Sequence, residues 1–212
     1  MNTIIFDLDG TLLNTLDDLA DALNYALEVF GYPKCTLKQV KGFVGNGVKK
    51  LVERALPPYL KQEKKNELYQ VFWDYYSKNC ANKTKPYEGI LELLIQLKER
   101  GIKLAIVSNK MDSAVQELRS LYFDGIVDVA VGVGDGVATK PDPTGTLRAM
   151  ERLGSTSKET IFVGDSEVDI ETAGRAGLEC ISVLWGFKEK DFLIENGAVK
   201  LIERPEEILN YL

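Results

Sequence analysis

The stretch TIIFDLDGTLLN, residues 3–14, is the most informative part of the sequence, because an apolar run leads in it directly to two carboxylates. The apolar residues at 3–6 predict a strand that is covered on both faces. In open parallel sheets, such strands present reactive groups at their carboxyl ends. We therefore expect Asp7 and Asp9 at the mouth of a site. Gly10 allows a sharp turn there, and the Thr11 hydroxyl can hold a neighbouring carboxylate in one rotamer.

The composition limits the chemistry that the chain can perform. Its 212 residues, 45% of them hydrophobic, suffice for one core and a small accessory unit. A net charge of -6 and a pI near 4.9 argue against a nucleic-acid or anionic-membrane partner. The chain contains no histidine, which excludes imidazole-based triads and histidine metal sites. The chemistry must therefore use carboxylates, lysine, hydroxyls or a bound metal.

The three cysteines, Cys35, Cys80 and Cys180, are widely spaced and form no CxxC pair. This pattern argues against a disulfide framework or a zinc site and predicts a reducing, cytoplasmic location. The sequence enters its first strand at once and has no 18-residue apolar run. We therefore expect neither an export signal nor a membrane segment.

Helical and alternating patterns divide the chain. Apolar residues recur at helical spacing over 16–30, and again near 48–56 and 68–76, so residues 15–84 are predicted to be all-helical. From residue 85 onward, helical stripes alternate with short β-branched runs, as in βαβ units. The prediction is an α/β core, residues 1–14 and 85–212, interrupted by a helical insertion.

Within the second part, strands are expected at 103–107, 126–131, 161–163 and 180–184, with helices between them and a final helical pair. The first of these strands ends at Ser108-Asn109-Lys110. The glycine-rich segment 132–136 lacks the spacing of a nucleotide loop and is interpreted as a turn. Residues 139–143 are interpreted as a rigid extended entry to the next helix, which presents Lys140.

Polar side chains follow the predicted parallel strands, so one sheet edge collects them. Carboxylates that share a small site repel one another and lose hydration, and a hard divalent cation resolves both problems. Oxygen-only ligands favour Mg²⁺. With Lys140 and Ser108 as further partners, the edge is suited to a phosphoryl group. The carboxylates in question are Asp7, Asp9, Asp165 and Asp169.

Each cluster taken alone also has a plain structural interpretation. Ser108 and Asn109 are suited to cap the next helix, Lys140 to lie in solvent, and Asp165 with Asp169 to sit favourably at a helix N-terminus. Together these interpretations would require several coincidences at comparable strand ends. The combination therefore favours phosphoryl transfer.

At this point the residues resemble the haloacid dehalogenase-like superfamily of phosphohydrolases. DLDGT at 7–11, Ser108-Asn109, KPDP at 140–143 and GDSEVD at 164–169 occur in the order and spacing of that family. The resemblance implies a Rossmann-like parallel-sheet core with an inserted all-helical cap domain at 15–84 that supplies substrate specificity. It also implies a Mg²⁺-dependent phosphatase that acts through an aspartyl-phosphate.

Carried over to this chain, the resemblance makes Asp7 the nucleophile and Asp9 the general acid and then base. Ser108 would bind a phosphoryl oxygen with help from Asn109, and Lys140 would neutralise charge. A hydrogen bond from Thr11 could tune Asp9. The resemblance implies that Mg²⁺ is held by Asp7, the Asp9 carbonyl, Asp165 and, directly or through water, Asp169.

The segment FVGNGV at 43–48 is similar to the cap of bacterial phosphoglycolate phosphatases. Gly45, Asn46 and Gly47 would let backbone amides approach a small anion at a helix start, although a plain interhelical turn remains the alternative. The implied substrate is 2-phosphoglycolate or a similar small phosphorylated metabolite. A pyrophosphatase, a β-phosphoglucomutase-like enzyme and a non-catalytic phospholigand-binding protein stay open. Leu19, where mutases carry a cap histidine, weakens the mutase alternative. The chain is expected to be a monomer or homodimer.

Overall fold

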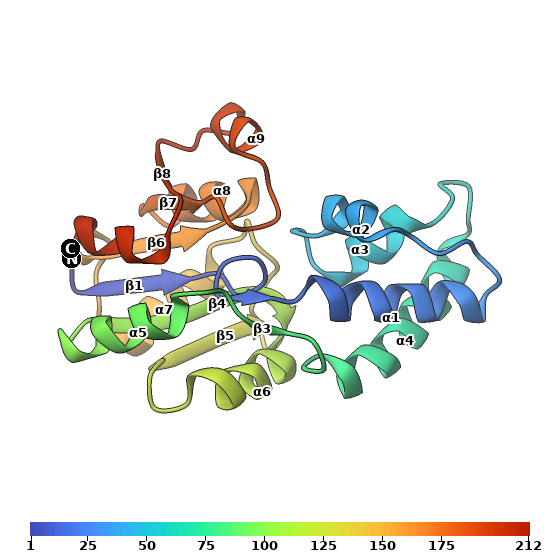
Figure 1. Ribbon diagram of the computed structural model, residues 1–212, viewed down its shortest axis with the longest axis horizontal. Helices are drawn as coiled ribbons and strands as arrows, with labels where there is room; N and C mark the ends of the chain where they lie inside the picture. Colours follow the sequence, from blue (N-terminus) through green and yellow to red (C-terminus); the bar gives the residue numbers. More distant parts are fainter. The chain divides into compact units, whose positions relative to one another are not determined.

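The computed structural model describes residues 1–212 and places strand β1, Thr3–Phe6, inside a six-stranded sheet (Figure 1). The strand order is β5-β4-β1-β6-β7-β8, and every pairing is parallel. The predicted α/β class with a parallel sheet is confirmed. The other strands are β4 (Lys103–Met111), β5 (Val129–Val133), β6 (Thr160–Gly164), β7 (Glu179–Val183) and β8 (Lys200–Ile202).

Helices cover both faces of this sheet. Ile5, Ala105 and Phe162 share one hydrophobic cluster with residues of α7 and α8. Their strand neighbours Ile4 and Leu104 point the other way and are also buried, which is why these strands are apolar throughout rather than alternating. The helices are α5 (Ile90–Glu99), α6 (Asp112–Phe123), α7 (Thr144–Leu153), α8 (Glu167–Arg175) and α9 (Lys190–Glu195).

The chain divides into two compact units, one of Met1–Asn14 with Pro86–Leu212 and one of Thr15–Lys85. The second unit holds the helices α1 (Leu16–Val29), α2 (Leu37–Phe43), α3 (Val48–Ala55) and α4 (Gln62–Asn79). Its core is formed by buried apolar faces of α1 and α4, and the rings of Tyr25 and Tyr75 stack at a centroid distance of 4.5 Å. The short strands β2 (Leu13–Asn14) and β3 (Lys85–Pro86) pair where the chain passes between the units.

Four local predictions differ from the structure. The strand expected at 126–131 lies at Val129–Val133. The strand expected at 103–107 continues to Met111, which pairs with Val133 after a register shift, so the strand includes the polar residues 108–110. Residues 139–143 form a turn rather than an extended segment, and the Asp142 amide donates to the Thr139 carbonyl. The prediction of a final pair of helices missed strand β8, because its three residues are too few to show a periodic pattern.

The three cysteines are free. None of the helices is both long enough and apolar enough to span a bilayer.

Candidate active site

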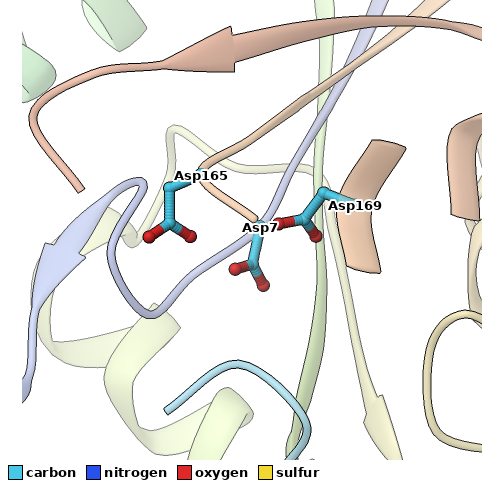
Figure 2. Close-up of side chains that lie close together, drawn as sticks. All are labelled: Asp7, Asp165 and Asp169. Carbon is cyan, nitrogen blue, oxygen red and sulfur yellow. The ribbon is translucent and has the colours of Figure 1, made fainter. Parts of the chain in front are cut away.

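Three carboxylates meet at the carboxyl ends of β1 and β6 (Figure 2). Asp7 follows β1 directly, and its amide donates to the Val163 carbonyl at 2.9 Å, so the neighbouring strand fixes its backbone. Asp165 follows β6, and Asp169 lies in the first turn of α8. All three are buried, and one oxygen from each lies within 4.8 Å of the others. The donors are oxygens only, which fits a hard cation such as Mg²⁺.

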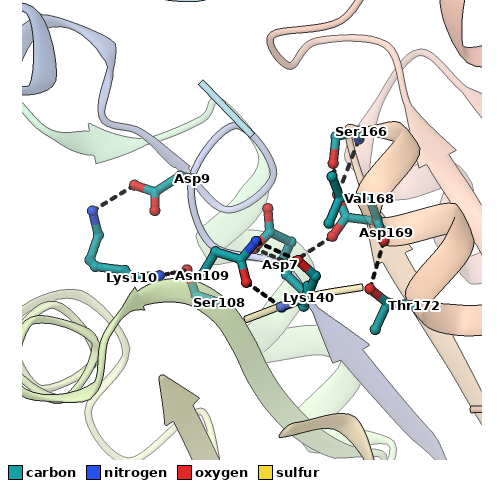
Figure 3. Close-up of polar contacts among 10 residues, drawn as sticks. All are labelled: Asp7, Asp9, Ser108, Asn109, Lys110, Lys140, Ser166, Val168, Asp169 and Thr172. Carbon is teal, nitrogen blue, oxygen red and sulfur yellow. Dashed lines mark hydrogen bonds and ion pairs between the residues drawn. The ribbon is translucent and has the colours of Figure 1, made fainter. Parts of the chain in front are cut away.

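Lys140 joins two members of this acid cluster. Its ammonium lies 2.7 Å from Asp7 Oδ1 and 2.6 Å from Asp169 Oδ1 (Figure 3). Asp169 is held from its other oxygen, because the Ser166 hydroxyl donates to Asp169 Oδ2 at 2.6 Å. The Lys140 side chain is 5% exposed, so the alternative interpretation of Lys140 as a solvated surface lysine is wrong.

Glycines line the cluster where backbone and carboxylates approach most closely. A Cβ atom at Gly164 would lie 2.3 Å from Cβ of Asp169, and one at Gly186 would lie 2.3 Å from Cβ of Asp165. Gly186 also precedes Phe187, whose amide donates to Asp165 Oδ2 at 2.6 Å. The loop after β7 therefore fixes Asp165.

Burial and mutual repulsion shape the protonation of this cluster. Desolvation is the main cause that raises the pKa of Asp7, to about 7, against the opposing pull of Lys140. Desolvation and then the charge of Asp169 raise the pKa of Asp165 well above its ordinary value. Burial opposes the charged form of Lys140, but attraction by Asp169 and Asp7 outweighs it and raises the pKa of that ammonium. The carboxylates gather more negative charge than one lysine offsets, which is a further reason to expect a cation.

The Asp9 carboxylate lies outside the acid cluster of Asp7, Asp165 and Asp169, and the metal role of its carbonyl stays a prediction. Its Oδ1 lies 2.9 Å from the ammonium of Lys110, a residue at the end of β4. Figure 3 shows this pair apart from the contacts of Lys140. Strand β1 ends at Phe6, and the chain then turns, with the amides of Leu12 and Leu13 both donating to the Leu8 carbonyl, so Asp9 leaves the acid cluster although it lies only two residues from Asp7.

Ser108 and Asn109 both lie within β4. Ser108 is buried, and its Oγ accepts from the Lys110 amide at 3.2 Å. The Asn109 side chain bonds the backbone of Lys140 twice, since Oδ1 accepts from the Lys140 amide at 2.6 Å and Nδ2 donates to its carbonyl at 3.2 Å. Asn109 therefore positions Lys140, a task that sequence reasoning did not assign to it.

Thr11 does not make the hydrogen bond that the sequence suggested. Its hydroxyl is buried without a hydrogen-bond partner, and its carbonyl accepts from Trp185 Nε1 at 3.0 Å. Asp9 is paired with Lys110 instead. A direct contact of Thr11 with substrate stays a prediction that its complete burial does not favour.

In the helical unit, the segment with Gly45, Asn46 and Gly47 adopts the backbone that its glycines permit, with φ of 125° at Gly45 and 81° at Gly47. The Arg54 guanidinium donates to the Phe43 carbonyl at 2.7 Å and to Asn46 Oδ1 at 2.5 Å. Arg54 thus fixes this loop from within α3. Binding of an anion by the loop stays a prediction.

Sequence reasoning missed three contributors to the site, namely Lys110, Ser166 and the amide of Phe187. Lys110 directly follows the Ser108-Asn109 pair, and this adjacency is the signal that could have indicated it. Ser166 and Asp169 form a capping box with the usual spacing. Nothing in the sequence indicates the Phe187 amide.

Comparison with known proteins gives a consistent result. The family model described as haloacid dehalogenase-like hydrolase matches residues 4–183. The phosphoglycolate phosphatase of Aquifex aeolicus is 34% identical over 213 residues, covering 100% of this chain and 97% of that protein. That of Haemophilus influenzae is 37% identical, covering 88% of this chain and 89% of that protein.

Solved structures agree with these relatives. A crystal structure from Lactobacillus delbrueckii subsp. bulgaricus, provisionally assigned as a phosphoglycolate phosphatase, matches with a TM-score of 0.96 and 36% identity. The match covers 99% of this chain and 97% of that one.

Proposed function

The chain belongs to the haloacid dehalogenase-like hydrolase family, and we propose that it hydrolyses 2-phosphoglycolate to glycolate and phosphate. The family and the phosphoglycolate phosphatases that the chain resembles identify it as a phosphatase that acts on phosphoric monoesters. The observation that carries the proposal is the buried Asp7 carboxylate, paired with Lys140 and facing Asp165 and Asp169. Its relatives are phosphoglycolate phosphatases, and this supports the choice of substrate.

The proposed cofactor is Mg²⁺, held by Asp7 and Asp165, with Asp169 contributing directly or through water and Asp9 through its carbonyl. The buried, oxygen-only donor set fits that ion. Bound there, Mg²⁺ supplies positive charge that stabilises the phosphoryl oxygens in the transition state.

Asp7 is the proposed nucleophile. One of its carboxylate oxygens attacks phosphorus, the bond from phosphorus to the glycolate oxygen breaks, and an aspartyl-phosphate forms. Lys140, 2.7 Å from Asp7 Oδ1, offsets the negative charge that collects around the reacting group. Asn109 keeps Lys140 in place through its backbone, and Ser108 is the proposed hydroxyl donor to a phosphoryl oxygen.

Asp9 is the proposed proton carrier. It delivers a proton to the departing glycolate oxygen and then removes one from the water that attacks phosphorus, which returns Asp7 as a carboxylate and releases phosphate. Its carboxylate is separate from the acid cluster and therefore free of the ligand role proposed for Asp7. Two displacements replace one very slow hydrolysis.

The helical unit is the proposed source of further specificity, through the amides of the segment Gly45, Asn46 and Gly47, with closure that excludes water. The glycine backbone and the Arg54 contacts support an ordered loop of this kind.

The test measures phosphate release from 2-phosphoglycolate, pyrophosphate and a panel of sugar and nucleotide phosphates, with Mg²⁺ or with EDTA. We expect Mg²⁺-dependent hydrolysis with a preference for 2-phosphoglycolate of about tenfold or more in kcat/KM, or about 1.4 kcal/mol. Asp7→Asn should abolish turnover, because the amide is a poor nucleophile at phosphorus.

The same assay separates the alternatives. If the wild type is weakly active on all substrates and Asp7→Asn abolishes this activity, the proposed reaction is supported and the proposed substrate is wrong. Preferred hydrolysis of pyrophosphate, or an isomerised sugar phosphate as product, would point to the pyrophosphatase or mutase instead. Absence of turnover on every compound would favour a phospholigand-binding protein.

A further inference from the structure

The ion pair between Lys110 and Asp9 has no part in the mechanism above. The ammonium of Lys110 lies 2.9 Å from Asp9 Oδ1, and the Lys110 side chain is 2% exposed while that of Asp9 is 15% exposed. Burying a lysine to this extent is costly unless its charge is compensated. Lys110 is thus a second buried cation beside the reacting groups, and it is distinct from Lys140.

The strand places Lys110 next to the proposed phosphoryl site. Ser108 and Lys110 are two positions apart in β4, in the segment between Val107 and Met111 where the register of the strand shifts. The Lys110 amide also donates to Ser108 Oγ, which ties the two residues together. In Figure 3 the Lys110 side chain reaches Asp9 from the side opposite to Asp169.

This placement puts the ammonium on the leaving-group side of the reaction. Asp9 is proposed to give its proton to the ester oxygen, so that oxygen must lie about 2.7 Å from the Asp9 carboxyl group. Since Nζ of Lys110 is 2.9 Å from Oδ1, proton donation by Oδ1 places the ester oxygen within about 6 Å of that ammonium.

A carboxylate fits the distance between the ester oxygen and the Lys110 ammonium. A carboxylate one carbon away from the ester oxygen extends about 3 Å beyond it, and one charge-assisted hydrogen bond of about 2.8 Å then reaches the ammonium. A neutral substituent of the same size offers no charge to a buried cation. We propose that Lys110 is a specificity-determining residue that binds the carboxylate of an α-phosphoryloxy acid in the sheet core. This inference rests on the proposed function, because it assumes the roles given there to Asp7 and Asp9.

The experiment compares 2-phosphoglycolate with ethyl phosphate, which has similar size and lacks the carboxylate, in the full-length protein with Mg²⁺. The readout is the ratio of the two kcat/KM values. Lys110→Met and, in parallel, Lys110→Gln should each lower this ratio by about tenfold or more, mainly through a higher KM for 2-phosphoglycolate. Lys110→Arg keeps the charge and should retain more of the ratio than either neutral variant. Lys200→Met is the matched control, because Lys200 forms an exposed ion pair with Glu179, and it should leave the ratio unchanged.

The outcomes separate this inference from the proposed function. If the wild-type protein prefers 2-phosphoglycolate but both neutral variants lower the ratio by less than about tenfold, the inference is wrong and the function stands. Lys110 would then only position Asp9. If the wild type prefers a different α-phosphoryloxy acid over its neutral analogue and the variants lose that preference, the inference stands and the substrate is wrong. A wild-type ratio near one for 2-phosphoglycolate and for the other α-phosphoryloxy acids, each against its neutral analogue, would overturn both.

Discussion

At the scale of single residues, the acid cluster depends on contacts too close to admit one more methyl group. Gly164 lies beneath Asp169, and Gly186 lies against Asp165. Neither glycine has a backbone φ in the left-handed region, so conformational freedom does not explain them. Their value is the absence of a side chain, which lets two carboxylates lie against the backbone.

Substitution of Gly164 tests this close approach. Gly164→Ala should displace Asp169, whose Cβ and Cγ lie 2.3 Å from the added atom, and so weaken its contact with Lys140. We expect a loss of about 1–3 kcal/mol in the free energy of unfolding and a fall in kcat/KM of tenfold or more. Thermal melting and phosphate release measure the two effects.

Gly174→Ala is the matched control, since Gly174 lies in α8 and has no atom within 4 Å of an added Cβ. Alanine there should stabilise the helix by about 0.5–1 kcal/mol and leave turnover unchanged. If Gly164→Ala melts and turns over like the wild type, the claim of close approach fails.

At the scale of elements, the carboxyl ends of β1, β4 and β6 bring the polar groups together, and α3 fixes the loop that precedes it. Helix α3 starts after Gly47, and Arg54 in its last turn reaches back to the Phe43 carbonyl and Asn46. A guanidinium can make several such bonds in one plane, which an ammonium cannot. The helix thereby holds its own entry loop in shape.

Removal of this clamp should loosen the loop. Arg54→Met is expected to speed amide hydrogen exchange at residues 43–47 and, under the proposed role of that loop, to raise KM for 2-phosphoglycolate by about threefold to tenfold with a smaller change in kcat. Lys50→Met removes an exposed ion pair with Glu53 in the same helix and serves as the control. Unchanged exchange at 43–47 in Arg54→Met would count against the clamp. A changed exchange with an unchanged KM would remove the loop from substrate binding.

At the scale of the whole molecule, burial of the acid cluster makes the stability of the fold depend on pH. Burial raises the pKa of Asp7 to about 7 and raises that of Asp165. Both folded-state pKa values exceed the unfolded value near 4, so the folded protein holds more protons than the unfolded chain between those limits. Without metal, these groups therefore lower the free energy of unfolding as pH rises from about 4 to about 7. The raised pKa of Lys140 adds a contribution that stays constant over this range, because that ammonium is charged in both states.

The metal-free protein should therefore become less stable as pH rises from about 4 to about 7. In EDTA, the stability of the wild type relative to Asp165→Asn should fall with rising pH across this window, by about 1 kcal/mol or more, since one pKa unit corresponds to about 1.4 kcal/mol. Mg²⁺ competes with protons for the same oxygens, so it should raise the melting temperature more at pH 8 than at pH 6. At a hundredfold excess over its dissociation constant, the gain is about 2.7 kcal/mol.

Chemical denaturation and thermal melting at several pH values measure both quantities, with Asp165→Asn as the variant that should lose most of the response to Mg²⁺. A wild-type stability that rises relative to Asp165→Asn between pH 4 and pH 7 would contradict the argument. An equal response to Mg²⁺ in the two proteins would show that the ion binds elsewhere.

The sequence alone predicts the α/β class, the parallel sheet and the strand ends that carry Asp7 and Asp165, because these depend on local apolar patterns and on the position of polar residues after them. It also located the helical stretch that begins after residue 14, since helical periodicity is a local property. It missed β8, whose three residues carry too little pattern.

Which side chains meet depends on contacts between segments that are far apart in the sequence. Asp9 and Asp7 look equivalent in DLDGT, yet Asp9 pairs with Lys110 while Asp7 pairs with Lys140 across 133 residues of chain. The amide of Phe187 and the glycines beneath the carboxylates likewise act through contacts between distant segments. The physical reason is that a local pattern fixes the direction in which a side chain leaves its strand, whereas its partner depends on how the neighbouring strands and loops pack.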